Sequence, residues 1–157
     1  MLEIRTKTAA QTQKLGNFLG TKWSAGDLVL LNGELGAGKT TLVRGVVAGA
    51  GGPSSNVTSP SYTYLNIYQA DYPVYHLDVY LLNSIDDLYQ IGIEELYQQG
   101  LVIIEWGSKF ASDLLGPYWE INIAYTDVEQ ERTVTIRPPE NRLYQMKELA
   151  SFGDFNV

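Results

Sequence analysis

The sequence predicts an α/β domain in which a mixed parallel and antiparallel β-sheet is flanked by helices. Three observations support this fold class. The chain has 157 residues, the length of one ordinary domain, so we expect a single domain over residues 1–157. Short apolar runs alternate with segments of helical periodicity, as in chains whose strands and helices follow one another. Some apolar runs lack polar residues, which is typical of strands covered on both faces.

The composition excludes several classes of protein. Apolar residues make up 45% of the sequence, so an overall disordered chain is not expected. The absence of cysteine excludes disulfide frameworks, thiolate metal sites and cysteine nucleophiles. The chain has 11 Lys and Arg against 18 Asp and Glu, a net charge of −7. This balance disfavours direct binding of DNA, tRNA or an anionic membrane.

No segment has the pattern of a membrane span or a secretion signal. The longest uncharged stretch, residues 45–70, is interrupted by Gly, Pro, Asn and Ser. The N-terminus begins Met-Leu-Glu-Ile-Arg-Thr-Lys and lacks the apolar core of a signal peptide. We therefore expect a cytoplasmic protein without membrane contact.

The N-terminal part of the chain is expected to form two strands and two helices. Residues 2–6 alternate between apolar or hydroxyl side chains and charged ones, which predicts a strand. Thr8 and Gln11 match a capping box, so a helix is expected to follow and to run to about residue 22. Residues 27–32 predict a buried strand. A second helix is expected over residues 40–50 and is stopped by Gly-Gly-Pro.

The rest of the chain is expected to contribute most of the sheet. Ser84 and Asp87 predict a capped short helix through Leu88. The two consecutive strands expected at 62–68 and 74–80 are joined by a short turn, which predicts an antiparallel pair. The two late strands, 119–125 and 133–137, face each other across a polar turn. The residues after Pro138-Pro139 are expected to form a C-terminal tail, 138–157, with a loose helix around 143–149. The predicted strands are residues 62–68, 74–80, 101–104, 119–125 and 133–137.

A glycine-rich turn lies between the buried strand 27–32 and the helix 40–50. Its sequence, Gly-Glu-Leu-Gly-Ala-Gly-Lys-Thr, fits the phosphate-binding pattern Gly-x4-Gly-Lys-Ser/Thr without deviation. Glycines let backbone N–H groups turn toward phosphate oxygens, and the helix N-terminus adds unpaired donors and partial positive charge. Lys39 would reach the β- and γ-phosphates, and the Thr40 hydroxyl would bind Mg²⁺. The sequence therefore predicts a P-loop NTPase-type fold that binds ATP or ADP with Mg²⁺. The expected contact residues are Gly33, Glu34, Leu35, Gly36, Ala37, Gly38, Lys39, Thr40 and Thr41.

Such a site also needs an acid at the end of a neighbouring buried strand, to hold the water shell of the metal. Leu-Val-Ile-Ile-Glu has that form and makes Glu105 the preferred metal-site acid. Asp78 is either a second metal-site acid or a strand-end cap. His76, Asp78 and Tyr80 are expected on one face of a strand, and we interpret His76 as a structural residue. Trp106 either stacks on a ligand or fills the core.

Two longer segments carry further hypotheses. Residues 58–62, Thr-Ser-Pro-Ser-Tyr, have the composition of a turn, and beside a bound nucleotide they could form a loop that senses the γ-phosphate. Residues 45–108 contain no Lys or Arg and are acidic. They predict either a solvated acidic face or a surface for a basic partner or a metal. The acids of this segment are Asp71, Asp78, Asp86, Asp87, Glu94, Glu95 and Glu105.

The chain resembles the bacterial TsaE (YjeE) ATPases over residues 8–109. Four blocks occur in the order and spacing of that family: Gly-Glu-Leu-Gly-Ala-Gly-Lys-Thr-Thr-Leu-Val-Arg-Gly, Val-Thr-Ser-Pro-Ser-Tyr-Thr, His-Leu-Asp-Val-Tyr and Ile-Glu-Trp-Gly. The resemblance implies a role in forming the threonylcarbamoyl group on the adenosine next to the anticodon, in tRNAs that read codons beginning with A. It also implies a small ATPase subunit that works with TsaD, which carries the transfer chemistry, and with TsaB.

The resemblance also implies roles for particular residues. Lys39 and Thr40 would hold phosphate and Mg²⁺, and Glu105 would be the acid on the metal. We therefore expect Glu105, Asp78 and Lys39 to be the catalytic residues. The remaining implied positions are Trp106 beside the nucleotide and Thr8 near the base.

Two positions depart from the family pattern. Leu81 stands where the family usually has Arg after His-x-Asp-x-Tyr, and Gly107 stands where it usually has Pro.

The main alternative function is a stand-alone P-loop kinase of a small molecule. Such kinases surround the transferred phosphoryl group with cations and close a lid over it. Residues 45–108, where such a lid would be expected, contain no Lys or Arg. A regulatory GTPase is disfavoured because no Asn-Lys-x-Asp sequence is present. A nucleotide-binding module that does not hydrolyse its ligand differs from an ATPase only in whether Glu105 or Asp78 positions a water molecule.

Overall fold

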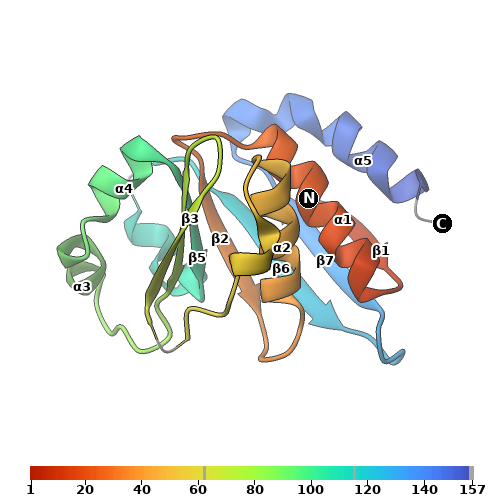
Figure 1. The fold of residues 1–157 in the computed structure, drawn as a ribbon, viewed down its shortest axis with the longest axis horizontal. Helices are drawn as coiled ribbons and strands as arrows, with labels where there is room; N and C mark the ends of the chain where they lie inside the picture. Colours follow the sequence, from red (N-terminus) through yellow and green to blue (C-terminus); the bar gives the residue numbers. More distant parts are fainter. Residues whose placement is uncertain (62, 115, 156–157) are drawn as a thin grey trace.

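The computed structural model of the protein describes residues 1–61, 63–114 and 116–155. These residues form a seven-stranded sheet in the order β1-β7-β6-β2-β5-β4-β3, with helices on both faces (Figure 1). The predicted α/β fold class is therefore confirmed. The strands are β1 (Leu2–Thr6), β2 (Leu28–Gly33), β3 (Leu65–Gln69), β4 (Pro73–Asp78), β5 (Leu101–Glu105), β6 (Trp119–Tyr125) and β7 (Arg132–Arg137).

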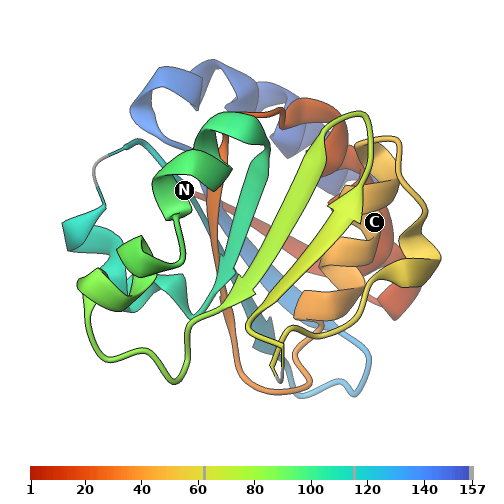
Figure 2. The ribbon, with the colours of Figure 1, turned by 60° about the vertical axis from the view of Figure 1, so that its left-hand side comes forward.

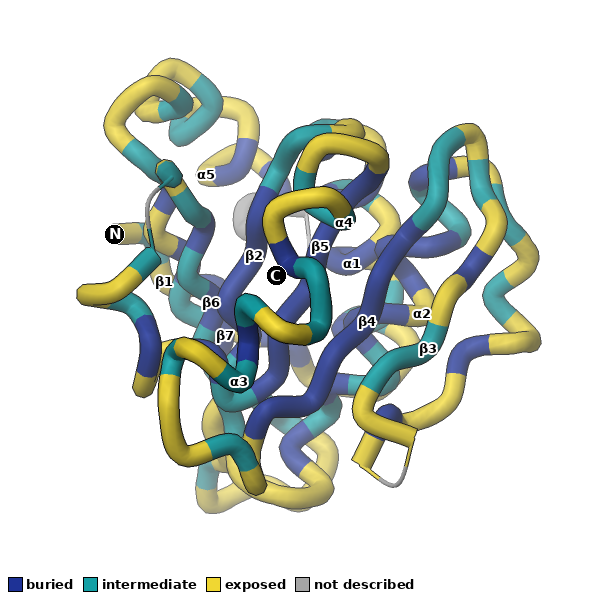
Figure 3. Tube along the Cα trace, turned by 90° about the vertical axis from the view of Figure 1, so that its left-hand side faces the viewer, coloured by how far each residue is buried: buried dark blue, intermediate teal, exposed yellow. Residues whose placement is uncertain are grey.

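The centre of the sheet consists of the parallel strands β6, β2, β5 and β4. The carboxyl ends of parallel strands meet at one edge, where open α/β sheets bind ligands. Here β2 ends at Gly33, β4 at Asp78 and β5 at Glu105. Both Leu31 on β2 and Asp78 are in register with Glu105. Figure 3 shows β2, β4 and β5 largely buried, whereas most residues of β3 at the edge are intermediate or exposed.

The outer strands complete the sheet by antiparallel pairing. The predicted antiparallel pair is confirmed as β3 and β4, and the two late strands as β6 and β7. At the other edge, β1 pairs with β7.

Two cores lie on opposite faces of the sheet, and Figure 2 shows the helices that cover the two faces. Side chains alternate between the faces, so Val29 and Leu31 of β2 belong to one core, and Leu28 and Leu30 to the other. Helices α1 and α2 cover the first core, and α3, α4 and the 3-10 helix η2 cover the second. The helix bounds are α1 (Ala9–Lys22), α2 (Lys39–Gly49), α3 (Ile85–Gln90), α4 (Ile93–Gln99) and η2 (Gly107–Asp113).

Helices α1 and α2 meet along a glycine seam formed by Gly16, Gly20, Gly45 and Gly49. A Cβ atom at Gly45 would overlap the carbonyl oxygen of Gln13, and one at Gly16 would overlap that of Leu42. The two backbones therefore touch directly, which only glycine permits. This contact fixes the helix that follows the glycine-rich turn against α1.

The C-terminal tail is packed against the rest of the chain. It forms a 3-10 helix, η3 (Glu140–Gln145), and then α5 (Met146–Phe155), which lies beside α1 in Figure 1. Leu149 and Phe152 join the core under α1, and the Phe152 ring centroid lies 5.3 Å from that of Phe18. No helix in the described ranges is long and apolar enough to cross a membrane.

Three details differ from the sequence predictions. Strand β3 begins at Leu65 rather than at residue 62, which itself lies outside the described residues. Strand β4 ends at Asp78, so the prediction that Tyr80 shares its strand face was wrong. Helix α4 was not predicted; it has only seven residues and follows Gly92, whose φ of 87° is left-handed.

Candidate nucleotide-binding site

The glycine-rich turn, residues 33–40, has the backbone shape of an anion cradle; we call it the phosphate loop. Gly36 and Gly38 adopt left-handed φ angles of 80° and 113°, which are strained for residues with a Cβ. The Ala37 N–H donates to the Glu34 carbonyl at 3.0 Å and closes the turn. Gly38 caps α2 without a side-chain hydrogen bond. The first N–H groups of α2 are therefore open to an anion at the loop.

The β6–β7 hairpin holds this loop through two side chains that sequence reasoning missed. The Tyr125 hydroxyl donates to the carbonyl of Leu35 at 2.6 Å, and Arg132 Nε donates to that of Ala37 at 2.9 Å. The Arg132 guanidinium carbon also lies 4.6 Å from the centroid of the Tyr125 ring. These bonds fix two carbonyls of the loop and shape it before any ligand binds.

Lys39 is nearly buried at the N-terminus of α2. Its side chain is 9% exposed, and its Nζ lies 3.5 Å from Glu105 Oε1. The same Nζ lies 4.4 Å from the centroid of the Trp106 ring. The Trp106 backbone has a left-handed φ of 65°, and its ring lies 5.1 Å from that of Tyr80. Trp106 therefore lies against the lysine of the phosphate loop.

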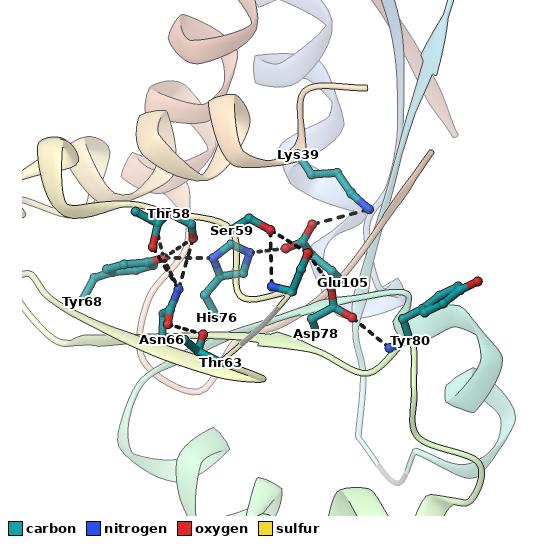
Figure 4. A network of polar contacts seen from close by, with 11 residues as sticks. Lys39, Thr58, Ser59, Thr63, Asn66, Tyr68, His76, Asp78, Tyr80 and Glu105 are labelled. Atoms are coloured by element: carbon teal, nitrogen blue, oxygen red, sulfur yellow. Dashed lines mark hydrogen bonds and ion pairs between the residues drawn. The ribbon is translucent and has the colours of Figure 1, made fainter. Parts of the chain in front are cut away.

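Glu105 is the centre of a buried polar network (Figure 4). It is 2% exposed, and a buried carboxylate is unfavourable unless it is paired. Lys39 approaches one carboxylate oxygen, and His76 Nε2 lies 2.8 Å from the other. His76 is 0% exposed, and its Nδ1 lies 3.2 Å from the Tyr68 hydroxyl. The interpretation of His76 as a structural residue did not foresee this contact with Glu105.

Asp78 has the hydrogen bonds of a strand-end cap. Its Oδ1 accepts from the Tyr80 N–H at 2.8 Å, and its Oδ2 accepts from the Ser61 hydroxyl at 3.4 Å. It is 8% exposed and pairs in register with Glu105. The two carboxylates thus lie side by side on adjacent strands, while the metal role of Asp78 stays a prediction.

The segment 58–61 lies against the same network. The Tyr68 hydroxyl oxygen lies 2.9 Å from the Thr58 carbonyl oxygen and accepts from the Thr58 N–H at 3.3 Å. The Asn66 side-chain amide also donates to the Thr58 carbonyl, at 3.2 Å. Residue 62, the last residue of the predicted γ-phosphate loop, lies outside the described residues.

A small pocket of about 120 Å³ lies between the phosphate loop, the start of α1 and the β6–β7 hairpin. Besides Gly36, Ala37 and Gly38 of the loop, it is lined by Ala9, Thr12, Thr41, Gln130 and Arg132. Thr8, the residue expected near a base, caps α1 by accepting from the Gln11 N–H at 3.1 Å, and its place near a base stays a prediction. Its neighbour Ala9 reaches the pocket.

The two departures from the family pattern have local explanations. Leu81 is 61% exposed, and Lys109 Nζ donates to the carbonyls of its two neighbours, Tyr80 at 2.9 Å and Leu82 at 2.6 Å. A cation from another part of the chain thus holds this loop. At Gly107, a Cβ would lie 2.8 Å from Leu30 Cδ2 and 3.1 Å from Ile104 Cβ, so a larger residue would require these side chains to shift.

Comparisons with known proteins agree with this geometry. The sequence model of the family described as "Threonylcarbamoyl adenosine biosynthesis protein TsaE" matches residues 6–134. Two curated relatives carry the name tRNA threonylcarbamoyladenosine biosynthesis protein TsaE. The protein from Treponema pallidum is 38% identical over 120 residues, which are 76% of this chain and 87% of that one. The protein from Nostoc sp. is 35% identical over 145 residues, 88% of this chain and 86% of that one.

A solved structure has the same fold over nearly the whole chain. The crystal structure of YdiB from Bacillus subtilis matches with a TM-score of 0.73 at 28% identity, covering 98% of this chain and 95% of YdiB. Together with the phosphate loop and the buried acid beside it, these matches lead to one conclusion: the chain belongs to the TsaE family.

Proposed function

We propose that this protein is a Mg²⁺-dependent ATPase that supports formation of the threonylcarbamoyl group on the adenosine next to the anticodon, in tRNAs that read codons beginning with A. The observation that carries the proposal is the contact between Lys39 of the phosphate loop and the buried Glu105 on the neighbouring strand. The names of the relatives supply the tRNA modification.

The site residues fit a nucleotide with Mg²⁺. Within the described ranges, no cluster of three His, Asp or Glu side chains could hold a metal alone. Mg²⁺ at phosphates uses only one or two protein ligands and keeps several waters, so such a cluster is not required. Thr40, in the first turn of α2, would supply a hydroxyl ligand, and Glu105 would hold the water shell or the attacking water.

The proposed mechanism depends on position and charge. Backbone N–H groups of the phosphate loop and Lys39 would bind the β- and γ-phosphates, and Lys39 would have to exchange its contact with Glu105 for one with phosphate. Glu105 would then orient the attacking water, with Asp78 supporting the same edge of the sheet. The pocket beside the phosphate loop would accept part of the nucleoside near Ala9, whereas Trp106 lies on the Glu105 side.

Few cations remain to stabilise the transition state, which supports a partner protein. Arg132 is bonded to a loop carbonyl, and Lys109 to two carbonyls of the loop after β4. Asp86, Glu94 and Glu95 are exposed on α3 and α4, a surface that suits a basic partner. We propose that TsaD- and TsaB-like subunits are these partners, that tRNA is contacted only indirectly, and that the protein acts in the cytoplasm.

The test is phosphate release from ATP in the presence of Mg²⁺. It is measured for this protein alone and again after addition of tRNA and of the TsaD- and TsaB-like subunits from the same organism. We expect slow hydrolysis alone and formation of the modified nucleoside only in the full mixture. The Lys39→Ala variant should abolish both readouts. Transfer of the γ-phosphate to a small acceptor without the partners would instead favour the small-molecule kinase.

A further inference from the structure

We propose that Tyr68 sets the position of the ring proton on His76, and that this pair thereby orients the Glu105 carboxylate for ATP hydrolysis. Tyr68 and His76 are positioning residues in this proposal, because they act through Glu105. The inference rests on the proposed ATPase function, which it deepens by assigning two residues that the phosphate-loop pattern does not include.

The geometry is a continuous line of polar atoms through the core. It runs from the Thr58 backbone to the Tyr68 hydroxyl, then to the two ring nitrogens of His76, and ends at Glu105 (Figure 4). Tyr68 is 5% exposed, and its ring centroid lies 5.9 Å from that of His76. Because both rings are buried, water does not replace a missing proton donor or acceptor at this place.

The available protons determine how this line must be arranged. The Tyr68 hydroxyl has one proton and two acceptors within reach, the Thr58 carbonyl at 2.9 Å and His76 Nδ1 at 3.2 Å. His76 Nε2 lies 2.8 Å from Glu105 Oε2, and in the tautomer with the ring proton on Nε2, on the Glu105 side, Nδ1 is an acceptor. Tyr68 can satisfy that acceptor by donating to Nδ1.

The Thr58 segment competes for the same proton. The Thr58 carbonyl already accepts from the Asn66 amide at 3.2 Å, so it does not depend on Tyr68 alone. When the Tyr68 proton points to Thr58, His76 Nδ1 has no donor from this hydroxyl, and the ring is no longer held with its proton on Nε2. A shift of the segment 58–61 would thus reach Glu105 through one hydroxyl group.

The chain allows a direct measurement, because His76 is its only histidine. Protein labelled with ¹⁵N-histidine would report the tautomer of this ring by NMR, at constant pH and without any activity. We expect the proton on Nε2 in the wild type and a mixture of both tautomers in Tyr68→Phe, which keeps the ring but removes the hydroxyl. Tyr75→Phe is the matched control: it also removes a buried hydroxyl from β3–β4, on the opposite face, where Tyr75 donates to Gln99 at 3.2 Å. The control should leave the His76 spectrum unchanged.

The catalytic part is tested by ATP turnover and ATP binding. We expect Tyr68→Phe to lower kcat about tenfold with nearly unchanged ATP affinity, and Tyr75→Phe to change neither. His76→Gln places an amide, which has no tautomers, beside Glu105. In that background Tyr68→Phe should lower kcat less than about twofold, because the two residues act in series. His76→Gln also serves as the test if Tyr68→Phe does not fold: its kcat should fall while ATP affinity is kept.

The outcomes separate this inference from the proposed function. An active wild type with an unchanged His76 spectrum and kcat in Tyr68→Phe would overturn the inference alone, as would additive effects of the two substitutions. A wild type without any ATP turnover, with or without the partner subunits, would overturn the proposed function and the catalytic part of the inference together. A wild-type ring with its proton on Nδ1 would overturn the role of Tyr68 whatever the activity.

Discussion

Lys39 Nζ lies 3.5 Å from Glu105 Oε1, so the lysine of the phosphate loop and the acid of β5 form a buried ion pair. Both side chains are almost inaccessible, at 9% and 3%. Removing one member of such a pair leaves the other charge buried, which is strongly unfavourable. A bound phosphate can replace Glu105 as the partner of the Lys39 ammonium group. A metal ion with its waters can then balance the negative charge of Glu105. Nucleotide and Mg²⁺ are therefore expected to bind together.

The Lys39→Ala variant should bind ATP about tenfold to a hundredfold more weakly, because it loses hydrogen bonds to a charged ligand. Isothermal titration calorimetry in the presence of Mg²⁺ would measure the change. Lys22→Ala is the control, since it removes a surface ion pair with Glu148 far from the loop. Unchanged ATP affinity in Lys39→Ala would contradict the site assignment.

The Glu105→Gln variant should lose ATP hydrolysis while keeping most of its ATP affinity. The carboxylate is expected to act on the metal waters or the attacking water, an effect that appears mainly in the transition state. Single-turnover phosphate release and equilibrium binding should be measured on the same preparation, with Glu120→Gln on β6 as the control. Parallel losses of binding and hydrolysis would make Glu105 a ground-state ligand or a folding residue instead.

Asp78→Asn separates the two interpretations of Asp78. The amide oxygen can still accept from the Tyr80 N–H, so a cap role predicts nearly normal turnover and thermal stability. A role in the metal site predicts that turnover falls at least tenfold without a matching loss of stability, because the charge is lost. We expect the second result. Wild-type turnover in Asp78→Asn would leave Asp78 as a cap only.

The Gly45→Ala variant should be strongly destabilised. A methyl group would overlap the Gln13 carbonyl oxygen, so α1 and α2 would have to move apart. Overpacking of this kind costs about 1–3 kcal/mol and occasionally more. Urea denaturation would measure the loss, and Gly116→Ala is a suitable control because its Cβ would meet only the end of the Tyr97 side chain, at 3.3 Å. Wild-type stability of Gly45→Ala would argue against the backbone contact.

Stability should decrease in alkaline solution through Tyr72. Burial raises the pKa of Tyr72 above its ordinary value of 10.0, and Asp27 and Asp71 add to the increase. As the pH rises past about 10, the unfolded chain loses this proton first, so the unfolded state binds fewer protons and the free energy of unfolding falls. Tyr72→Phe should weaken this dependence, whereas the exposed Tyr144→Phe should not. Identical pH profiles for the wild type and Tyr72→Phe would contradict the assignment.

Local sequence signals predicted those parts of the fold and site whose residues are close in the chain. The pattern of a buried strand, a glycine-rich turn and a helix predicted β2, the phosphate loop and α2. An apolar run that ends in an acid predicted that Glu105 lies at the sheet edge beside that loop. The capping pattern at Thr8 and Gln11 placed the start of α1 correctly, since a cap depends on only a few neighbouring residues.

The remaining features depend on contacts between distant segments. Tyr125 and Arg132 bind loop carbonyls about ninety residues earlier, which no periodicity indicates. The contact of His76 with Glu105 requires knowing which strands are neighbours. The glycine seam also escaped prediction, although Gly16-x3-Gly20 and Gly45-x3-Gly49 have the spacing of one helical face and could have indicated a close helix contact.

The glycine seam also has a dynamic consequence. Two helices whose backbones touch cannot open independently, so α1 and α2 should exchange their amide hydrogens as one cooperative unit. A ligand at the phosphate loop stabilises this unit as a whole. Nucleotide should therefore slow deuterium uptake along the full length of α1, as far as its C-terminal turn near Lys22. An N-terminal helix that lies mostly outside the pocket would then report occupancy of the loop.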